Sequence, residues 1–258
     1  MGALFGLWFI IWPILGSLLL KQGINAVFMW WVLFALFDTL ILTAFLKETH
    51  VGRDRAHKVD LFGLKTIRKY LRDPHIAKYL RSMMIIGTWF FTYQSVLTID
   101  TKIEFGVGGE SFGYILALIG LVSAINMALL LPKFRLKNFS SAKLVTIAHL
   151  GVWVILAALT TNQLLSTSSF WAFVILISIQ PLFASLLQPI YQSDIVKLTP
   201  KGKTGEVIGV STSVNTIAMI VGPILGWLML DAWLSIYIVA LMCVVISFMV
   251  IKKRYYPW

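Results

Sequence analysis

Cysteine and charge are both scarce in this sequence of 258 residues. Its single cysteine, Cys243, rules out an intramolecular disulfide and a cysteine-based metal cluster. Only 13% of the residues are charged and 59% are hydrophobic, whereas soluble domains average about 25% and about 45–50%. So large an apolar excess rules out a disordered chain and exceeds what one water-soluble core could bury. A membrane protein is the class that remains.

Motifs of enzymes and metal sites are also lacking. The run Gly202-Lys203-Thr204 resembles the end of a phosphate-binding loop, but Lys197 stands where that loop needs its first glycine. No His-Glu-x-x-His run of the zinc-binding type occurs anywhere in the sequence. We therefore expect no enzymatic activity, no bound metal and no cofactor.

Long apolar runs dominate what is present. A helix needs about 20 apolar residues to cross the hydrocarbon layer of a bilayer. Eight stretches qualify: 1–20, 26–46, 83–101, 112–132, 144–161, 170–193, 207–230 and 233–251. The sequence therefore predicts an all-α membrane protein with eight transmembrane helices, whose first partner is the lipid bilayer.

Basic residues are distributed unevenly over the connections between these stretches. The connections 47–82, 133–143, 194–206 and 252–258 hold ten, four, three and three Lys or Arg residues, and the other two are Lys21 and Lys102. Basic loops stay in the cytoplasm, so we expect a multi-pass protein of the cell membrane with both termini cytoplasmic. The net charge of +11 then marks the inner leaflet, and we expect no binding to nucleic acid.

The long connection 47–82 has an amphipathic segment. Leu64, Ile67 and Leu71 share one helical face, and basic residues surround them. This pattern is typical of a helix that lies on an anionic membrane surface, although a solvated charged linker would fit equally well. Asp73-Pro74 then predicts a helix N-cap followed by a first-turn proline, which would begin the third span.

An internal repeat links the first span to the seventh. WPILGSLLL at 12–20 returns as GPILGWLML at 222–230, an offset of 210 residues. Pro13 and Pro223, and likewise Gly16 and Gly226, fall in register inside apolar helices. Proline breaks the helical hydrogen-bond ladder and glycine lets a neighbouring backbone approach closely. We interpret these residues, together with Gly209 and Gly222, as a motif for helix packing or gating.

This repeat resembles the major facilitator superfamily, and most closely its drug:proton antiporter branch. Helix five of that branch carries the motif Gly-x8-Gly-x3-Gly-Pro-x2-Gly-Gly, and helix eleven is its symmetry equivalent. The copy in the seventh span matches at Gly209, Gly222, Pro223 and Gly226, and departs at Ala218 and Trp227. The copy in the first span replaces three of the glycines.

Other segments carry the same resemblance. Leu46-Lys47-Glu48-Thr49 is similar to the Leu-Pro-Glu-Thr ending of helix six, 105–121 to the passage from helix seven into eight, and 198–213 to the start of helix eleven. The resemblance implies that the eight spans are helices five to twelve of a major facilitator-type bundle whose first four helices are absent. A separate chain that carries those four helices is then a further implied partner.

The resemblance divides the chain into three parts. Residues 1–46 would be the last two helices of the N-terminal bundle, 47–82 a basic cytoplasmic loop with an interfacial helix, and 83–258 the six-helix C-terminal bundle. The counterpart of the family's gating loop, at 131–141, keeps three basic residues but lacks the aspartate.

Polar residues inside the spans are the candidates for a transport pathway, because secondary transporters bind substrate near the midplane. The candidates are Tyr93, Gln94, Asn126, Ser185, Gln188, Gln192, Thr212 and Asn215. The alternative is that each forms an interhelical hydrogen bond that holds the bundle together.

Two aspartates are candidates for proton coupling. Asp38 lies deep in an apolar run, where a charged residue costs about 2.5–3.5 kcal/mol. Asp100 lies at the outer end of the third span, where it is more easily solvated. A structural, hydrogen-bonded role is the alternative for Asp38. His149 lies near a cytoplasmic helix end, and we expect it to be interfacial.

These patterns lead to two hypotheses of different classes. The first is a secondary transporter that exports a small, drug-like solute in exchange for protons by alternating access. The second is a non-transporting membrane scaffold or truncated product, which keeps the helix packing without a working pathway.

Overall fold

The computed structural model describes residues 11–12, 14–16, 18–45, 64–130, 133, 139–164, 168–200, 202–231 and 236–252. Within these ranges every regular element is a helix and no strand occurs. The helices are α2 (Ile24–Phe45), α3 (Leu64–Arg72), α4 (Pro74–Phe105), α5 (Gly109–Ile125) with the π-helix η1 (Asn126–Leu130), α7 (Ser141–Leu164), α8 (Phe170–Ile179), α9 (Pro181–Leu198), α10 (Thr204–Asp231) and α11 (Ile236–Lys252).

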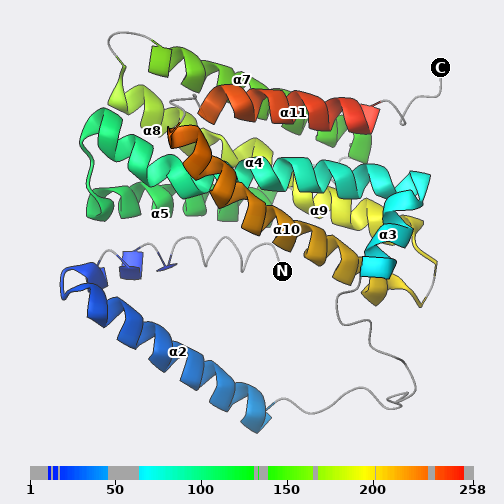
Figure 1. Cartoon of the computed structure of the whole chain (residues 1–258), viewed down its shortest axis with the longest axis horizontal. Helices are drawn as coiled ribbons and strands as arrows, with labels where there is room; N and C mark the ends of the chain where they lie inside the picture. Colours follow the sequence, from blue (N-terminus) through cyan, green and yellow to red (C-terminus); the bar gives the residue numbers. More distant parts are fainter. Residues whose placement is uncertain are drawn as a thin grey trace.

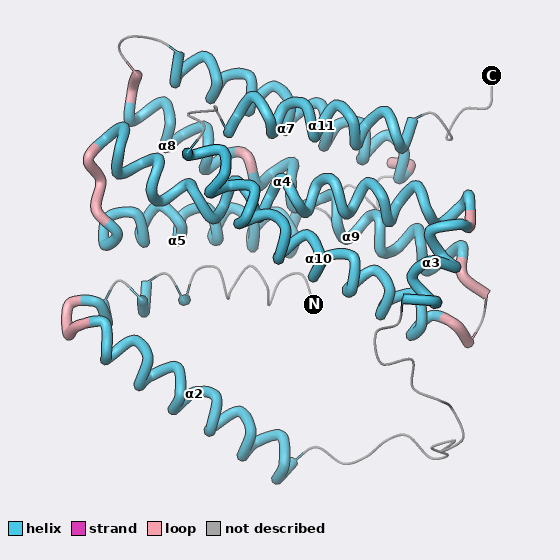
Figure 2. The backbone as a smooth tube through the Cα atoms, in the orientation of Figure 1, coloured by secondary structure: helices cyan, strands magenta, loops and turns pink. Residues whose placement is uncertain are grey.

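Helices α4 to α11 form an up-and-down bundle. In Figure 1, α4, α7 and α10 run from the right end of the bundle to the left, and α5, α8 with α9, and α11 run back. Figure 2 shows the loops that join the helices at these two ends. We call the right end the basic end, because Lys78, Lys143, Lys197 and Lys252 lie on the turns nearest to it.

Five of the described helices are long and apolar enough to cross a membrane: Ile24–Phe45, Ser111–Leu129, Ser141–Leu164, Phe170–Leu198 and Thr204–Leu230. Helix α11 is apolar but shorter, with 17 residues, and α4 has 32 residues with charged side chains toward both ends. Most of the first predicted span, including Pro13, lies outside the described residues. All-helical architecture is therefore confirmed for the described ranges, whereas the count of eight spans stays a prediction.

The N-terminal helix α2 lies apart from the bundle in Figure 1. No residue of α2 is buried, and its apolar side chains are exposed along its whole length. The Trp12 ring stacks on Trp31, with 4.9 Å between ring centroids, and meets Phe34 edge-on at 5.4 Å. A turn with Gly23 at a φ of 106° joins the two segments. Aromatic contacts of Trp12 thus pair the segment before Gly23 with α2, as expected for two consecutive spans.

The start of α4 confirms the N-cap predicted at Asp73. One carboxylate oxygen accepts hydrogen bonds from the backbone amides of His75, at 2.9 Å, and Ile76, at 3.4 Å. Pro74 occupies the first helical turn, where its missing amide hydrogen costs nothing. Because of this strong local signal, α4 begins at Pro74 rather than at residue 83, where the apolar run begins.

Replacing Asp73 with alanine should lower the free energy of unfolding by about 0.5–2 kcal/mol, because two amides of the first turn lose their acceptor. Thermal unfolding in detergent micelles, followed by circular dichroism, measures the change. Asp73→Asn retains a side-chain oxygen and is the matched control. Identical melting curves for Asp73→Ala and the wild type would contradict the capping role.

The amphipathic helix α3 packs against protein. Tyr70 is buried, and Ile67 and Leu71 are partly buried against the core at the basic end, formed with α4 and α10. On its polar side Lys69 Nζ lies 3.4 Å from the Glu206 carboxylate of α10. The bundle therefore covers the apolar face of α3. A helix on a membrane surface would turn this face to lipid, and a solvated linker would leave it in water.

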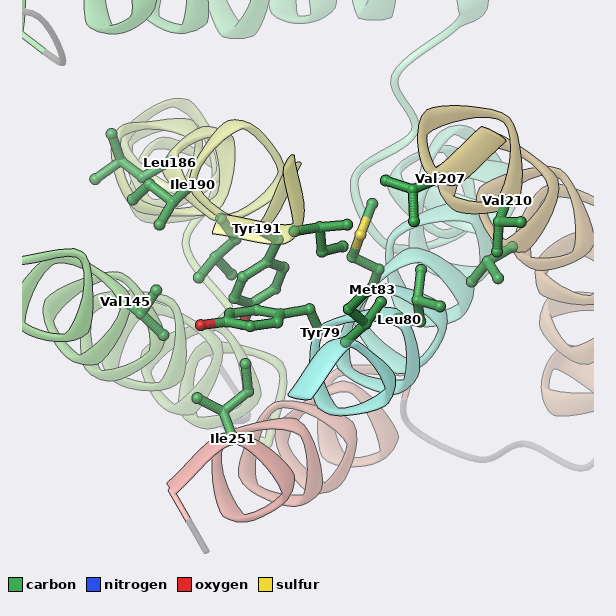
Figure 3. Close-up of a cluster of buried hydrophobic side chains, with 14 of the residues drawn as sticks. Tyr79, Leu80, Met83, Val145, Leu186, Ile190, Tyr191, Val207, Val210 and Ile251 are labelled. Atoms are coloured by element: carbon green, nitrogen blue, oxygen red, sulfur yellow. The ribbon is translucent and has the colours of Figure 1, made fainter. Parts of the chain in front are cut away.

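Two clusters of buried apolar side chains hold the bundle together. Figure 3 shows the cluster at the basic end, where the rings of Tyr79 from α4 and Tyr191 from α9 meet among apolar side chains of the neighbouring helices. The second cluster lies farther along the bundle and includes Trp89, Leu156, Phe173 and Tyr237. Helices α4, α7 and α11 contribute to both clusters, and α4 also packs against α3, α5, α9 and α10, so it is the central helix of the bundle.

The crossing of α10 over α4 depends on two glycines. A Cβ atom at Gly222 would lie 2.8 Å from the backbone nitrogen of Thr92, and one at Gly226 would lie 2.7 Å from Ser95 Oγ. The Thr92 hydroxyl donates a 3.0 Å hydrogen bond to the Gly222 carbonyl oxygen. Close approach of backbones at small residues is the usual way in which membrane helices gain contact.

Candidate functional site

A cavity of about 220 Å³ lies inside the bundle, between α4, α5, α9 and α10. Its wall is mostly apolar and rich in aromatic rings, among them Trp89, Phe90 and Tyr93 of α4. None of the described residues that line it is charged. Ligand pockets are typically apolar with a few polar groups that orient the ligand, and this cavity has that character.

The structure brings five of the eight predicted pathway residues to this cavity: Tyr93, Gln94, Ser185, Gln188 and Asn215. Asn126 lies behind its wall and contacts Ser185. Gln192 and Thr212 do not line the cavity. Thr212 is exposed, and its hydroxyl donates to the Ile208 carbonyl oxygen of its own helix.

A helix break forms one side of the cavity. Pro181 has no amide hydrogen, so α8 ends at Ile179 and α9 begins at Pro181 within one continuous span. Asn126 Nδ2, from η1, donates to the carbonyl oxygen of Leu182 and to Ser185 Oγ, both at 2.8 Å. Ser185 in turn donates to the Pro181 carbonyl oxygen at 2.6 Å. Asn126 therefore joins the end of α5 to the helix break. This role, a hydrogen bond that holds two helices together, is the alternative to a place in the transport pathway.

Substituting Asn126 with alanine should destabilise the bundle by about 1–3 kcal/mol, because buried acceptors at the break lose their donor. Unfolding by sodium dodecyl sulfate in mixed micelles measures the change. Thr161→Val is the control, since the Thr161 hydroxyl is exposed and bonds only to Ala157 of its own helix. Equal small losses for both variants would show that Asn126 does not hold the helices together.

Three buried polar side chains of the cavity wall lack hydrogen-bond partners among the described residues. They are the indole Nε1 of Trp89, the hydroxyl of Tyr93 and the amide Nε2 of Gln180. All three groups can donate a hydrogen bond. A buried donor without an acceptor is costly, so groups of this kind favour a ligand that accepts hydrogen bonds.

The two candidate aspartates lie in different surroundings. Asp100 is partly buried at the end of the bundle opposite the basic end, and Tyr237 of α11 donates a 2.9 Å hydrogen bond to its carboxylate. The Tyr237 ring also packs edge-on against Tyr93 of the cavity wall, at 6.1 Å between centroids. Asp38 is exposed on α2, a helix that contributes no residue to the cavity lining. Asp100 is thus the aspartate that a chain of contacts joins to the cavity.

His149 is buried rather than interfacial, contrary to our expectation. Only 2% of its surface is exposed, and its ring contacts hydroxyl groups of α9 and α11. No pattern near His149 indicates this burial, because the contacting residues are more than 40 positions away in the chain. This burial arises because α9 and α11 pack against α7 at this level.

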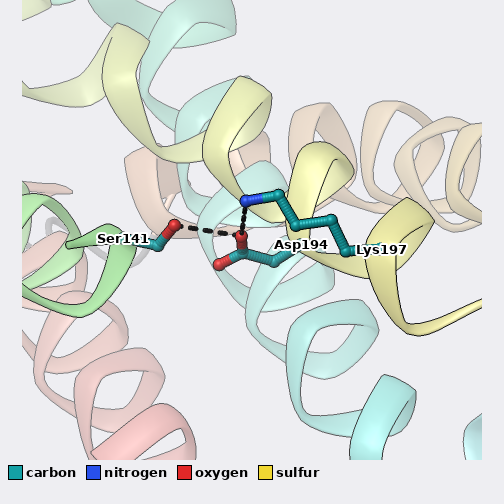
Figure 4. A network of polar contacts seen from close by, with 3 residues as sticks. All are labelled: Ser141, Asp194 and Lys197. Atoms are coloured by element: carbon teal, nitrogen blue, oxygen red, sulfur yellow. Dashed lines mark hydrogen bonds and ion pairs between the residues drawn. The ribbon is translucent and has the colours of Figure 1, made fainter. Parts of the chain in front are cut away.

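Charged side chains gather at the basic end. Asp194 of α9 accepts a 3.0 Å hydrogen bond from the Ser141 hydroxyl of α7 and lies 3.4 Å from Lys197 Nζ, as Figure 4 shows. This contact ties the start of α7 to the end of α9. None of the three residues lines the cavity, so their contact is an interhelical one that stabilises the bundle.

The remaining motif residues differ in their surroundings. A Cβ atom at Gly209 or at Gly16 would meet nothing within 4 Å, and Pro223 is half-buried inside α10. Among the motif residues that the structure describes, only Gly222 and Gly226 lie at a close helix crossing. The run Gly109–Gly113 matches the Gly-x-Ser-x-Gly pattern of some hydrolases, but it begins α5 after another helix and not after a strand.

Comparison with known proteins gives one match. Residues 135–257, which include α7 to α11, match the family model of the Major Facilitator Superfamily. No curated protein and no solved structure matches the chain. Members of this superfamily are transporters and not enzymes. Together with the apolar helices, the match supports a membrane transporter of the Major Facilitator Superfamily.

Proposed function

We propose that this chain is a proton-coupled efflux carrier, an antiporter, which moves a small solute through the cavity by alternating access. The observation that carries the proposal is the cavity itself, which lies within a bundle of apolar helices and collects five of the predicted pathway residues. Secondary transporters bind their substrates between helices near the middle of the membrane, often beside interrupted helices. The break at Pro181 is such an interruption.

The cavity wall favours an uncharged aromatic substrate that accepts hydrogen bonds. Its aromatic rings suit a flat apolar ring system. The unpaired donors of Trp89, Tyr93 and Gln180 suit carbonyl, nitro or ether oxygens. No carboxylate among the described lining residues is present to neutralise a cationic substrate. Drug-like solutes of moderate size combine these features.

Proton coupling needs a group that gains and loses a proton, and Asp38 and Asp100 are the candidates from the sequence. Asp100 has the better support, because Tyr237 and Tyr93 connect it to the cavity wall. Intramembrane carboxylates are frequent proton carriers in transporters.

Uptake of a labelled probe into everted membrane vesicles tests the proposal. Radiolabelled chloramphenicol, an uncharged aromatic compound with amide and nitro oxygens, is the probe, and ethidium is the cationic comparison. We expect chloramphenicol to accumulate when the vesicle interior is acidified, and we expect nigericin, which collapses the proton gradient, to abolish this. Uptake equal to that of vesicles without the protein, for both probes, would refute the carrier.

A non-transporting membrane scaffold is the second candidate. The observation that favours it is the separation of α2 from the described bundle, since two halves of a carrier must contact each other to alternate. The vesicle experiment separates the two candidates, because a scaffold would show no gradient-dependent uptake of either probe.

A further inference from the structure

Four polar side chains from four helices meet in a buried cluster toward the basic end of the bundle. They are Ser82 of α4, His149 of α7, Tyr191 of α9 and Ser247 of α11, and each is at most 2% exposed. His149 Nε2 lies 3.2 Å from Ser247 Oγ and 3.3 Å from the Tyr191 hydroxyl oxygen. Ser82 Oγ donates to Tyr191 at 3.0 Å and also bonds to Ser247 Oγ. We call these four residues the histidine cluster.

The tautomer of the neutral ring follows from its other nitrogen. His149 Nδ1 lies 2.9 Å from the Val145 carbonyl oxygen. A carbonyl oxygen can only accept, so Nδ1 must carry the hydrogen. Nε2 of the neutral ring is then an acceptor whose lone pair faces the hydroxyls of Ser247 and Tyr191. Imidazole is also the side chain that takes up a proton most readily near neutral pH.

The histidine cluster is joined directly to the cavity. The Tyr191 side chain lines the cavity wall while its hydroxyl belongs to the cluster. Met83, which follows Ser82 in α4, lines the same wall. A change in hydrogen bonding at His149 therefore reaches the cavity through one side chain.

We propose that His149 is a proton-binding site of the carrier, and that Tyr191 transmits its protonation state to the substrate cavity. This inference rests on the proposed function, because it adds to Asp100 a second group that responds to protons. Asp100 and Asp38 were the candidates from the sequence, and His149 lies toward the opposite end of the bundle from Asp100.

Proton uptake would reverse hydrogen bonds within the cluster. The Nε2 lone pair takes a proton from a hydronium ion of the solvent, which becomes water, and the new N–H group then donates to a hydroxyl oxygen. Ser247 or Tyr191, which donated to the neutral ring, must then accept. Hydroxyl groups can both donate and accept, so the cluster can stabilise both protonation states of the ring.

Charged groups on the surrounding helices are engaged elsewhere. On α4, Arg81 donates to the Leu71 carbonyl oxygen of α3, and Lys78 lies over the Tyr79 ring. On α9, Asp194 contacts Ser141 and Lys197. On α11, Lys252 lies over the Phe248 ring, which itself contacts the imidazole at 5.5 Å. Of the described titratable side chains, only Tyr191 has a hydrogen bond to His149 in this structure.

Nuclear magnetic resonance of the full chain in lipid nanodiscs tests proton binding without any substrate. With ¹³C-labelled histidine, the signal missing from His149→Gln identifies the ring. We expect that signal to titrate reversibly between about pH 4 and pH 8. His75→Gln is the control, because His75 is exposed at the start of α4 and outside the cluster. A His149 signal that stays constant over this range would overturn the proposal.

Coupling to the cavity is tested with Tyr191→Phe, which keeps the ring and removes the hydroxyl. In the wild type we expect the affinity for chloramphenicol to change about tenfold across the His149 titration, a typical size for coupled sites. We expect this pH dependence to be lost in Tyr191→Phe and in His149→Gln, and to remain in His75→Gln. Wild-type pH dependence in Tyr191→Phe would overturn the role of Tyr191.

Vesicle uptake separates this inference from the proposed function. We expect His149→Gln to bind chloramphenicol but to lose gradient-driven accumulation. Wild-type accumulation in His149→Gln would overturn the proton site and leave the carrier intact. If no gradient drives uptake even in the wild type, while the His149 ring titrates and changes probe affinity, the carrier fails and the proton site stands.

Discussion

Replacing Gly222 with alanine should force α10 away from α4 and destabilise the bundle. The new Cβ atom would lie 2.6 Å from Phe91 Cβ, 2.8 Å from the Thr92 nitrogen and 3.0 Å from the Phe91 carbonyl carbon. Two of these atoms belong to the backbone of α4 and cannot rotate away. The Thr92 hydrogen bond to the Gly222 carbonyl oxygen would be stretched as well.

The expected loss in the free energy of unfolding is about 1–3 kcal/mol, the usual cost of inserting a methylene group into a packed contact. Gly226→Ala should behave similarly, because its Cβ would lie 2.9 Å from Val96 Cγ2 and 3.1 Å from the Thr92 carbonyl oxygen. Unfolding of the purified variants by sodium dodecyl sulfate in mixed micelles measures both losses.

Gly209→Ala is the matched control on the same helix. Its Cβ would meet nothing within 4 Å, and alanine favours a helix over glycine by about 1 kcal/mol, so we expect no loss or a small gain in stability. Equal stability of Gly222→Ala and Gly209→Ala would contradict the close crossing of α10 and α4.

Filling the cavity should stop transport while leaving the bundle folded. Ser123 of α5 is half-buried and lines the cavity, so Ser123→Trp places an indole ring in the space proposed for the substrate. We expect the affinity for chloramphenicol to fall about tenfold or more, which corresponds to at least about 1.4 kcal/mol. Gradient-driven uptake should fall to the level of vesicles without the protein.

Leu121→Trp is the control for this substitution. Leu121 lies on the same helix but is 46% exposed on its outer face, so the same indole ring would point away from the cavity. Circular dichroism should show equal helical content for both variants. Unchanged uptake by Ser123→Trp would mean that solute does not pass through the cavity.

Local features of this fold could be predicted from the sequence. The N-cap at Asp73 is confirmed because a capping residue and a proline act on the next three residues only. The apolar runs predict the helical segments, and the internal repeat identifies Gly222 and Gly226 as residues of helix packing. The apolar run alone, which begins at residue 83, places the start of this span too late, since the first turns of α4 contain Lys78 and Arg81 and do not look apolar.

Features that depend on several helices could not be predicted. Nothing near His149 in the sequence indicates the cluster with Ser82, Tyr191 and Ser247. Its hydrogen-bond partners Tyr191 and Ser247 are 42 and 98 residues away in the chain. The same limit applies to Asn126, whose partners lie 56 and 59 residues away. Polarity on one helical face selects both Thr212 and Asn215, but it does not tell that Asn215 lines the cavity while Thr212 is exposed.

Flux through the purified chain in proteoliposomes tests the central claim most directly. With an acidic lumen, we predict that chloramphenicol enters the liposomes while protons leave, so that the lumenal dye pyranine reports alkalinisation at the same time. Both signals should vanish with nigericin and in Ser123→Trp. Accumulation no greater than in protein-free liposomes, with no proton movement on addition of the probe, would contradict the account of this chain as a carrier.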